Sequence, residues 1–219
     1  MNGSIKLPFP DREEAGKRLA LELTVYSSKD AIVLAIPRGG VVIGYQVAHK
    51  LKVPLDIIVP RKIGAPDNPE LAIGAVAEDG TLSLDNLAVR YMNVPETYIE
   101  GESRRQIIEI KRRLKLYRGD TPYPELQDRI VILVDDGIAT GSTIKAAIAS
   151  IRKKKPKSVI VAVPVAPRST VKDLEKEADR VICLSTPEFF YAIGQFYKDF
   201  SQTSDEEVIR LLKLTYSHS

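Results

Sequence analysis

The residues best suited to chemistry form one run, Asp135-Asp136-Gly137-Ile138-Ala139-Thr140-Gly141-Ser142-Thr143. It follows the apolar residues 131–134 and leads into a stretch with helical spacing. Backbone N–H groups at the start of a helix, together with the hydroxyls of Thr140, Ser142 and Thr143, can surround a phosphate. The phosphate would repel two carboxylates just before the loop, so these suit hydrogen bonds from neighbouring ligand hydroxyls. A phosphate with vicinal hydroxyls describes a ribose 5-phosphate.

Four apolar residues, two acids and a loop ending in Ala-Thr-Gly-Ser-Thr resemble the phosphoribosyl diphosphate signature of the type I phosphoribosyltransferases. The run is not a Walker A loop, and a plain capped strand-to-helix turn is the alternative interpretation. By the resemblance, Asp135 and Asp136 hold the ribose 2- and 3-hydroxyls, residues 138–143 hold the 5-phosphate, and Gly137 belongs to the same phosphoribosyl diphosphate site. The two acids would touch Mg²⁺ only indirectly, through those hydroxyls. The chain most resembles family members with an unassigned acceptor, over most of residues 30–205.

Two further loops carry glycine or basic residues at predicted strand ends. Pro37-Arg38-Gly39-Gly40 follows the first core strand, where family members use a short, strained loop to contact the diphosphate. Arg61-Lys62 ends the next strand and resembles the basic pair with which adenine-type members meet the same diphosphate. A glycine turn and a solvated basic pair are the respective alternatives. Residues 64–70 are expected to form an irregular exposed loop, and residues 63–73 would be the lid that closes over the reacting ribose.

The reaction implied by the resemblance needs positioning and charge more than acid–base groups. Pyrophosphate leaves C1 of the ribose as a nitrogen nucleophile enters, and Mg²⁺ offsets the leaving-group charge. The candidate catalytic residues are therefore Asp135, Asp136, Arg61 and Lys62. Hypoxanthine-guanine type members carry an Asp where this chain has Ala139, which argues against a 6-oxopurine acceptor.

The acceptor is expected to bind near residues 187–200, which hold four of the five Phe residues of the chain. In type I enzymes a variable hood stacks on the nucleobase. Phe189, Phe190 and Tyr191 are therefore the candidate base-binding residues. Packing of a terminal helix on the core is the alternative.

Hydrophobic periodicity predicts the elements that must position these residues. An Asp11-x-x-Glu14 signal opens a predicted helix over 11–26. Strands are predicted at 31–36, 55–59, 73–77, 81–84, 130–134, 159–163 and 180–184, with helices after residue 40 and over 95–117, 142–151 and about 169–177. This alternation predicts an α/β fold of the type I phosphoribosyltransferase kind, a twisted, mainly parallel sheet with helices on both faces, a small hood and a flexible loop or hairpin. We expect one domain over 1–219, with a core over about 30–185 and a C-terminal hood segment over about 186–219.

Composition excludes other classes of protein. The 219 residues are 44% hydrophobic and 28% charged, which argues against a disordered or fibrous chain. The net charge of +3 is too small for nucleic-acid binding through bulk electrostatics, so no nucleic-acid partner is expected. No run approaches the roughly 18 apolar residues of a membrane helix, so no membrane partner is expected either. A single cysteine, Cys183, favours a reducing, cytoplasmic location.

Two other functions stay open on the sequence alone. One is a regulatory protein that binds phosphoribosyl diphosphate without turnover, and the other is a hydrolase of ribose phosphates. A regulator would usually add a nucleic-acid surface, whereas the basic clusters at 111–113 and 152–157 suit solvated helix faces. His49 and His218 adjoin no motif and suit surface or packing roles. Related proteins often form dimers, so a homodimer is the assembly to test.

Overall fold

The structure, a computed structural model, describes residues 7–27 and 29–216. They form two compact units. Unit 1 contains the residues up to 58, residues 124–140 and those from 155 onward, and unit 2 contains residues 59–123 and 141–154. Among the described residues, no helix combines the length and the apolar character needed to cross a bilayer.

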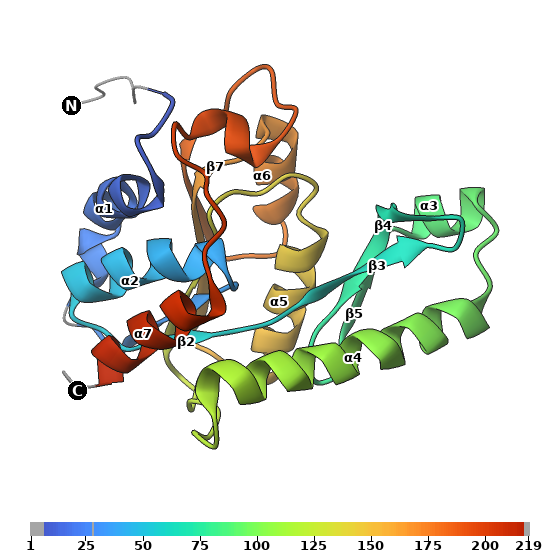
Figure 1. The fold of residues 1–219 in the computed structure, drawn as a ribbon, viewed down its shortest axis with the longest axis horizontal. Coiled ribbons are helices and arrows are strands. Elements are labelled where there is room, and N and C mark those ends of the chain that lie inside the picture. The colour runs from blue at the N-terminus through green and yellow to red at the C-terminus, as the bar shows by residue number, and fades with distance from the viewer. Residues whose placement is uncertain (1–6, 28, 217–219) are drawn as a thin grey trace. The chain divides into compact units, whose positions relative to one another are not determined.

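Unit 1 is built on a five-stranded parallel sheet flanked by helices, which confirms the predicted fold class (Figure 1). Its strands are β1 (Ala31–Ala35), β2 (Leu55–Ile57), β6 (Ile130–Val134), β7 (Ser158–Val165) and β8 (Arg180–Ser185). Every neighbouring pair is parallel, in the order β2-β1-β6-β7-β8. All residues of β1 and β2 are buried, as expected for apolar strands in a covered parallel sheet.

The strand order makes the boundary between β1 and β6 a topological switch point. The chain passes from β1 to β2 on one side of β1 and later continues through β6, β7 and β8 on the other. The connections after β1 and β6 therefore diverge, and ligands of open α/β sheets bind outside the carboxyl ends at such a switch point. The predicted loops at residues 37–40 and 135–141 both leave the sheet at this point.

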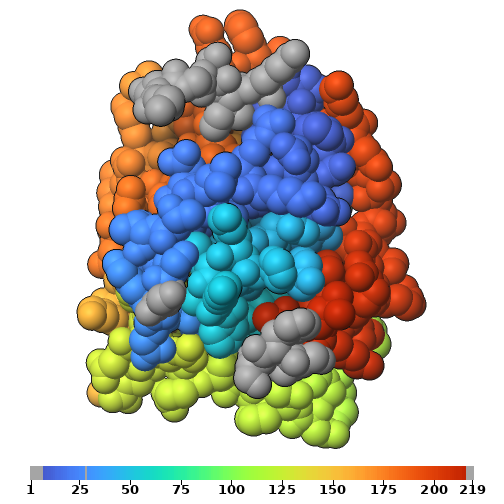
Figure 2. All heavy atoms as spheres, turned by 90° about the vertical axis from the view of Figure 1, so that its left-hand side faces the viewer, coloured from blue at the N-terminus to red at the C-terminus, as the bar shows by residue number. Residues whose placement is uncertain are grey.

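The described residues of unit 1 also form four helices and two 3-10 turns. They are α1 (Arg12–Glu22), α2 (Gly39–Leu51), α6 (Arg168–Leu174), α7 (Asp205–Tyr216), η1 (Thr24–Tyr26) and η2 (Ile193–Phe196). The predicted start of α1 is confirmed, because the Asp11 carboxylate accepts a hydrogen bond from the Glu14 N–H at 2.7 Å. In Figure 2, α1 (dark blue), α2 (lighter blue to cyan) and α7 (red) share one face, and α2 packs against both of the others.

Unit 2 is a three-stranded antiparallel sheet with three helices. Its elements are β3 (Arg61–Ala65), β4 (Asn68–Val76), β5 (Leu82–Leu84), α3 (Asn86–Tyr91), α4 (Glu96–Arg118) and α5 (Ser142–Lys153). The β4–β5 hairpin is confirmed: Gly80 has φ +80°, and the Asp79 carboxylate accepts a hydrogen bond from the Thr81 N–H at 3.1 Å. The predicted apolar stripe of α5 is buried, and α5 packs against the strands of unit 2.

The prediction of an irregular loop over residues 64–70 is wrong. Strands β3 and β4 form a hairpin there, turning at Pro66 and Asp67. The register shifts on both sides of Gly64, where a Cβ would overlap the backbone of Pro69. Glycine and proline therefore mark a tight turn and a bulge within a hairpin, rather than the absence of regular structure. Helix α3 was not predicted.

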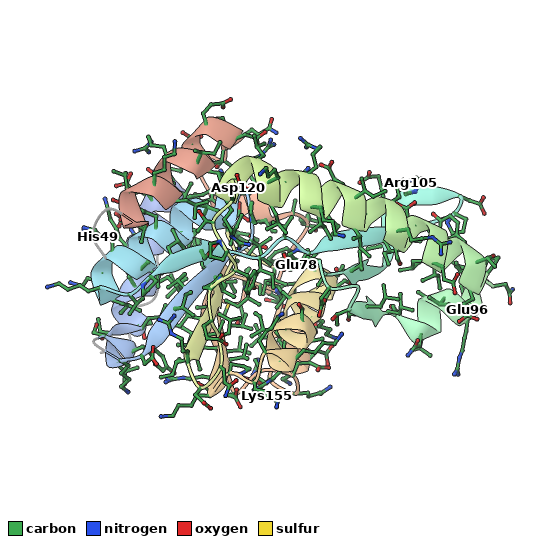
Figure 3. All side chains as sticks on the ribbon, turned by 90° about the horizontal axis from the view of Figure 1, so that it is seen from below. His49, Glu78, Glu96, Arg105, Asp120 and Lys155 are labelled. Carbon is green, nitrogen blue, oxygen red and sulfur yellow. The ribbon has the colours of Figure 1, made fainter. Side chains whose placement is uncertain are left out.

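The long helix α4 confirms the prediction over 95–117 to within a residue or two. Its charged side chains extend outward along its length, among them Arg105, which is 79% exposed (Figure 3). Arg112 and Arg113 both pair with Glu109, at 2.7 and 2.8 Å. The basic cluster at 111–113 is thus part of a charged helix surface, as its sequence spacing indicated.

Candidate active site

Two adjacent carboxylates lie at the carboxyl end of β6. Asp135 accepts a hydrogen bond at Oδ1 from the N–H of Asp136, at 2.8 Å. The first turn of α2 lies against this acid, and a Cβ on Gly40 would stand 3.0 Å from both the Cα and the Oδ1 of Asp135. Ordinary carbon contacts are about 3.5–4.0 Å, so the close approach requires glycine. The predicted glycine turn is therefore the start of a helix that touches the acid pair.

The second acid, Asp136, is held by residues from both ends of unit 1. Arg12 donates from Nε to Asp136 Oδ2 at 2.7 Å, and the two side chains are only 12% and 13% exposed. The same guanidinium donates to the carbonyl of Ser201 at 2.7 Å and lies 3.8 Å from the ring centroid of Phe200. The Tyr197 hydroxyl donates to the backbone carbonyl of Asp136 at 2.6 Å.

Burial dominates the electrostatics of these groups. It raises the pKa of Asp135 well above the usual value, and the neighbouring Asp136 carboxylate raises that pKa further. Burial also raises the pKa of Asp136, while Arg12 opposes this shift. The pKa of Tyr197 is raised by burial and by the acids, so its hydroxyl stays protonated and donates. The acid pair has given up hydration, and a ligand that brings hydroxyl donors or positive charge compensates for that loss.

The loop after the acids leads into α5 through a left-handed glycine, Gly141, with φ 82° and ψ 0°. The N–H of Ile138 donates to the carbonyl of Val165 at 3.0 Å, so this amide is already engaged. The expectation that every amide of residues 138–143 faces a phosphate therefore needs correction at Ile138. The Thr170 hydroxyl fixes the next residue by donating to the Ala139 carbonyl at 2.8 Å, and Ala139 and Thr140 are exposed.

The basic residues predicted to meet a diphosphate all have protein partners. Arg38 precedes α2, and its Nη1 lies 3.6 Å from Asp205 Oδ1. The other two belong to unit 2, where they begin β3; the prediction that they end the preceding strand is wrong, because β2 ends at Ile57. Arg61 donates from Nε to Gln106 Oε1 at 2.9 Å, and its pKa is lowered by burial and by nearby Arg113. Lys62 donates to Glu70 at 2.8 Å in an exposed pair.

The predicted base-binding residues differ in exposure. Phe189 and Tyr191 are 69% and 88% exposed, whereas Phe190 packs on Phe196 with ring centroids 4.9 Å apart. The Gln195 side chain orders this loop, because it accepts from the N–H of Tyr191 and donates to the carbonyl of Phe189. The alternative holds in part: only η2 is helical before α7 begins, yet Phe196 and Tyr197 of this segment are buried in the core.

Comparison with known proteins identifies the family. The model of the phosphoribosyl transferase domain matches residues 8–201. This chain belongs to that family. Two relatives from Mycobacterium tuberculosis strains, CDC 1551 / Oshkosh and H37Rv, each described as a "putative phosphoribosyl transferase", are 44% identical over 204 residues. That alignment covers 93% of this chain but 46% of each relative, so the chain spans about half of their length.

One solved structure is similar over nearly the whole phosphoribosyl transferase domain. It is the crystal structure of a protein from Thermus thermophilus, with 41% sequence identity and a TM-score of 0.81. The match covers 95% of this chain and 99% of that one. The arrangement of sheet and helices described above is therefore shared with a structure determined by experiment.

The residues of this phosphoribosyl transferase domain that sequence reasoning missed are Arg12 and Tyr197. Their neighbours Phe9 and Phe200 flank Tyr197, with ring centroids at 5.6 and 5.0 Å. The backbone of Phe9 accepts from and donates to residues 196–198, which joins the two chain segments. Arg12 and Asp136 are 124 positions apart, so no local spacing reveals the pair. The aromatic enrichment near residue 200 was the one available signal.

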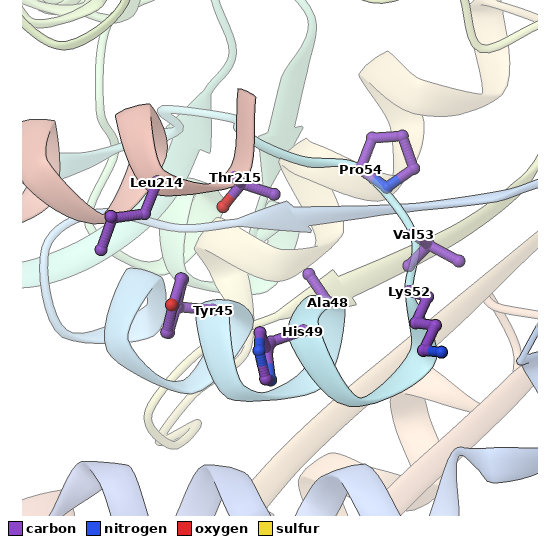
Figure 4. Close-up of a pocket in the computed structure, with 8 residues that line it drawn as sticks. All are labelled: Tyr45, Ala48, His49, Lys52, Val53, Pro54, Leu214 and Thr215. Carbon is purple, nitrogen blue, oxygen red and sulfur yellow. The ribbon is translucent and has the colours of Figure 1, made fainter. Parts of the chain in front are cut away.

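A hollow of about 530 Å³ lies between α2 and α7 (Figure 4). His49, which stacks on Tyr45 at a centroid distance of 5.9 Å, lines it together with Leu214. His49 is exposed, which confirms a surface role, and His218 lies outside the described residues. The hollow is at the carboxyl end of α2, about 15 Å along the helix axis from Gly39, and so stands apart from the acid pair.

Proposed function

We propose that this phosphoribosyl transferase domain transfers the 5-phosphoribosyl group of phosphoribosyl diphosphate to a nitrogenous base and releases pyrophosphate. The observation that carries the proposal is the enclosed Asp135–Asp136 pair at the switch point of the parallel sheet, backed by the first turn of α2. Carboxylates that have lost hydration favour a ligand with adjacent hydroxyl donors. The loop that follows leads directly into the amino end of α5, where a phosphate is electrostatically favoured.

In the proposed site, different residues bind the ribose hydroxyls and the 5-phosphate. Asp135 and Asp136 accept from the ribose 2- and 3-hydroxyls, and the loop after Ile138 holds the 5-phosphate through its remaining amides and hydroxyls. In the reaction the C1–O bond to pyrophosphate breaks as a bond from C1 to the base nitrogen forms. Pyrophosphate leaves with the bonding electrons, and the proton of the base nitrogen passes to the departing pyrophosphate or to water. The transition state carries positive charge on the ribose, which the two acids stabilise.

Neutralising the charge of the leaving group is the role proposed for the basic residues. Arg38 precedes the amino end of α2, whose first amides favour an anion. For Arg61 and Lys62 the proposal is supported by sequence resemblance, and a diphosphate would replace their present partners Gln106 and Glu70. Residues 63–73, which were predicted to form the lid, belong to the β3–β4 hairpin of unit 2.

Magnesium is compatible with the donor set of the acid pair. The described residues contain no cluster of three or more ligating His, Cys, Asp or Glu side chains, so they form no all-protein metal cage. Mg²⁺ usually keeps several waters and binds substrate phosphates, so it would sit on the diphosphate and the ribose hydroxyls, and Asp135 and Asp136 would touch it only indirectly through those hydroxyls. When bound, Mg²⁺ would act as a Lewis acid that neutralises leaving-group charge.

The acceptor and the biological setting form the remaining part of the proposal. The exposed rings of Phe189 and Tyr191 suit stacking on a nucleobase in the hood segment 186–219, with 30–185 as the core of one functional domain. A nucleobase acceptor supports a role in nucleotide salvage. The thiol of Cys183 is free, which supports a reducing, cytoplasmic location. A homodimer is the proposed assembly.

Calorimetric titration with magnesium phosphoribosyl diphosphate tests the site. Asp136→Asn and Thr140→Ala are each expected to weaken binding roughly 10- to 100-fold, the range for losing a hydrogen bond to a charged group. Asp173→Asn is the control, because that carboxylate of α6 forms an exposed ion pair with Lys176 and its change is expected to leave affinity unchanged. Absence of binding by the unaltered protein, or binding indifferent to both site variants, would overturn the assignment.

Turnover is tested by incubating the protein with the same ligand and a panel of purine and pyrimidine bases while measuring pyrophosphate. Release that depends on one base supports the transferase and identifies its acceptor. Release without any base indicates the ribose-phosphate hydrolase. Tight binding without release across the panel indicates the regulatory alternative.

A further inference from the structure

We infer that Arg12 is a positioning residue, which holds the Asp136 carboxylate in the orientation that meets the ribose hydroxyls; this inference rests on the proposed function. Arg12 opens α1, far along the chain from the acid motif, and nothing in that motif implies its involvement. Its Nε nevertheless donates directly to the Asp136 carboxylate.

The guanidinium group is fixed by three separate contacts. Its Nε donates to Asp136 Oδ2 at 2.7 Å, its Nη1 donates to the Ser201 carbonyl at 2.7 Å, and its central carbon lies 3.8 Å from the ring centroid of Phe200. A rigid planar fork with several donors can satisfy all three directions together, whereas a lysine ammonium cannot. The side chain is 12% exposed, so the contacts are little weakened by solvent.

The surroundings of Asp136 restrict its carboxylate to one orientation. A Cβ on Gly39 would overlap Oδ2 and stand 2.5 Å from Arg12 Nε, so the amino end of α2 closes that side. The backbone of Asp136 is held by the Tyr197 hydroxyl, which donates to its carbonyl. Oδ2 is therefore committed to Arg12, and Oδ1 is the oxygen we assign to a ligand hydroxyl.

The support behind Arg12 is rigid, as a positioning role requires. The Asp11 carboxylate caps α1 one residue earlier, and α1 packs along α2, the helix that closes on the acid pair. Groups held by well-packed elements keep a site within the narrow tolerance that catalysis needs. The competing explanation is that Arg12 only stabilises the fold by joining α1 to Ser201. That explanation predicts that replacing Arg12 lowers stability, and that its effect on ligand affinity does not depend on Asp136.

A double-mutant cycle on affinity for magnesium phosphoribosyl diphosphate separates the two explanations. Arg12→Met keeps the alkyl stem and is expected to weaken binding about tenfold, with Arg12→Lys recovering only part of the loss. In the Asp136→Asn background, Arg12→Met is expected to change affinity by less than about twofold, because the shared interaction is already broken. Lys17→Met is the control: this lysine of the same helix forms an exposed ion pair with Glu13, and its replacement should leave affinity unchanged.

Melting temperatures of all variants are recorded alongside the affinities. If Arg12→Met does not fold, Phe200→Leu removes the ring on which the guanidinium stacks, together with the ring contact to Tyr197, and is expected to weaken binding about threefold. Equal losses in both Asp136 backgrounds, or a lower melting temperature with unchanged affinity, would overturn the positioning role. A native protein that binds no ligand would overturn the proposed function itself, whereas a binding native protein with unaffected Arg12→Met overturns this inference alone.

Discussion

Replacing Gly40 by alanine tests the close contact between α2 and the acid pair. The new methyl carbon would stand 3.0 Å from Asp135 Cα, 3.0 Å from Asp135 Oδ1 and 3.1 Å from the Val134 carbonyl oxygen. Two of these three atoms are backbone atoms at the end of a buried strand, so they cannot move aside as the tip of a flexible side chain would. Helix α2 must shift away from β6 instead.

Two opposing effects decide the sign of the change in stability. Alanine gains at most about 1 kcal/mol over glycine from helix propensity, and less in a first turn. Overpacking of this kind costs about 1–3 kcal/mol. We therefore expect Gly40→Ala to lose about 1–2 kcal/mol, which corresponds to a melting temperature roughly 2–8 °C lower in a chain of this length. Affinity for phosphoribosyl diphosphate should fall as well, because the shift displaces Asp135.

The assay is thermal unfolding followed by circular dichroism, with Gly101→Ala as the control. Gly101 lies within α4, and a Cβ there meets nothing within 4 Å. This variant should gain the helix-propensity term alone, about 1 kcal/mol, and melt about 2–4 °C higher. A Gly40→Ala protein that melts at or above the temperature of the unaltered protein would refute the packing argument.

Two further predictions concern titratable groups away from the site. Burial raises the pKa of the Cys183 thiol to about 11, so at pH 8 iodoacetamide should alkylate the native protein roughly 100-fold more slowly than the unfolded chain; equal rates would contradict this. Hydrogen bonds from Arg112 and Arg113 lower the pKa of Glu109 to about 2, so its contribution to stability is present above about pH 4.5 and lost as the pH falls toward 2. Melting temperatures between pH 6 and pH 2.5 should therefore fall more steeply for the native protein than for Glu109→Gln, and parallel curves would count against that linkage.

The parts of the fold that sequence reasoning predicted well are those fixed by local pattern. The strand Ile130–Val134 is a continuous apolar run, and the acids and loop beyond it carry their own chemical signature. The α1 start was predictable because Asp11 and Glu14 interact three residues apart. Buried parallel strands and short-range caps leave a clear trace in sequence, since the same few residues both form and stabilise the element.

The parts that were missed depend on contacts between distant segments. Pro66 and Pro69 suggested an irregular loop, yet pairing with β3 and a bulge at Gly64 accommodates both prolines within a hairpin. The amide of Ile138 was counted as a phosphate donor because its bond to the Val165 carbonyl depends on a strand that follows later in the chain. In both cases the local structure depends on contacts with residues from other segments, and local sequence propensity does not contain that information.

The junction between residues 9–12 and residues 196–201 gives the acid pair an unusual dependence on chain topology. Contacts of such large sequence separation form late, because a long loop must close before they are gained. Arg12 donates to both Asp136 and the Ser201 carbonyl. During synthesis it can make the second contact only after a segment almost 190 residues later in the chain has been made. A nascent chain can form the parallel sheet before the contacts between residues 9–12 and residues 196–201 fix the Arg12 side chain beside the acid pair. The acid pair therefore gains its full set of contacts only after residues 196–201 have been synthesised.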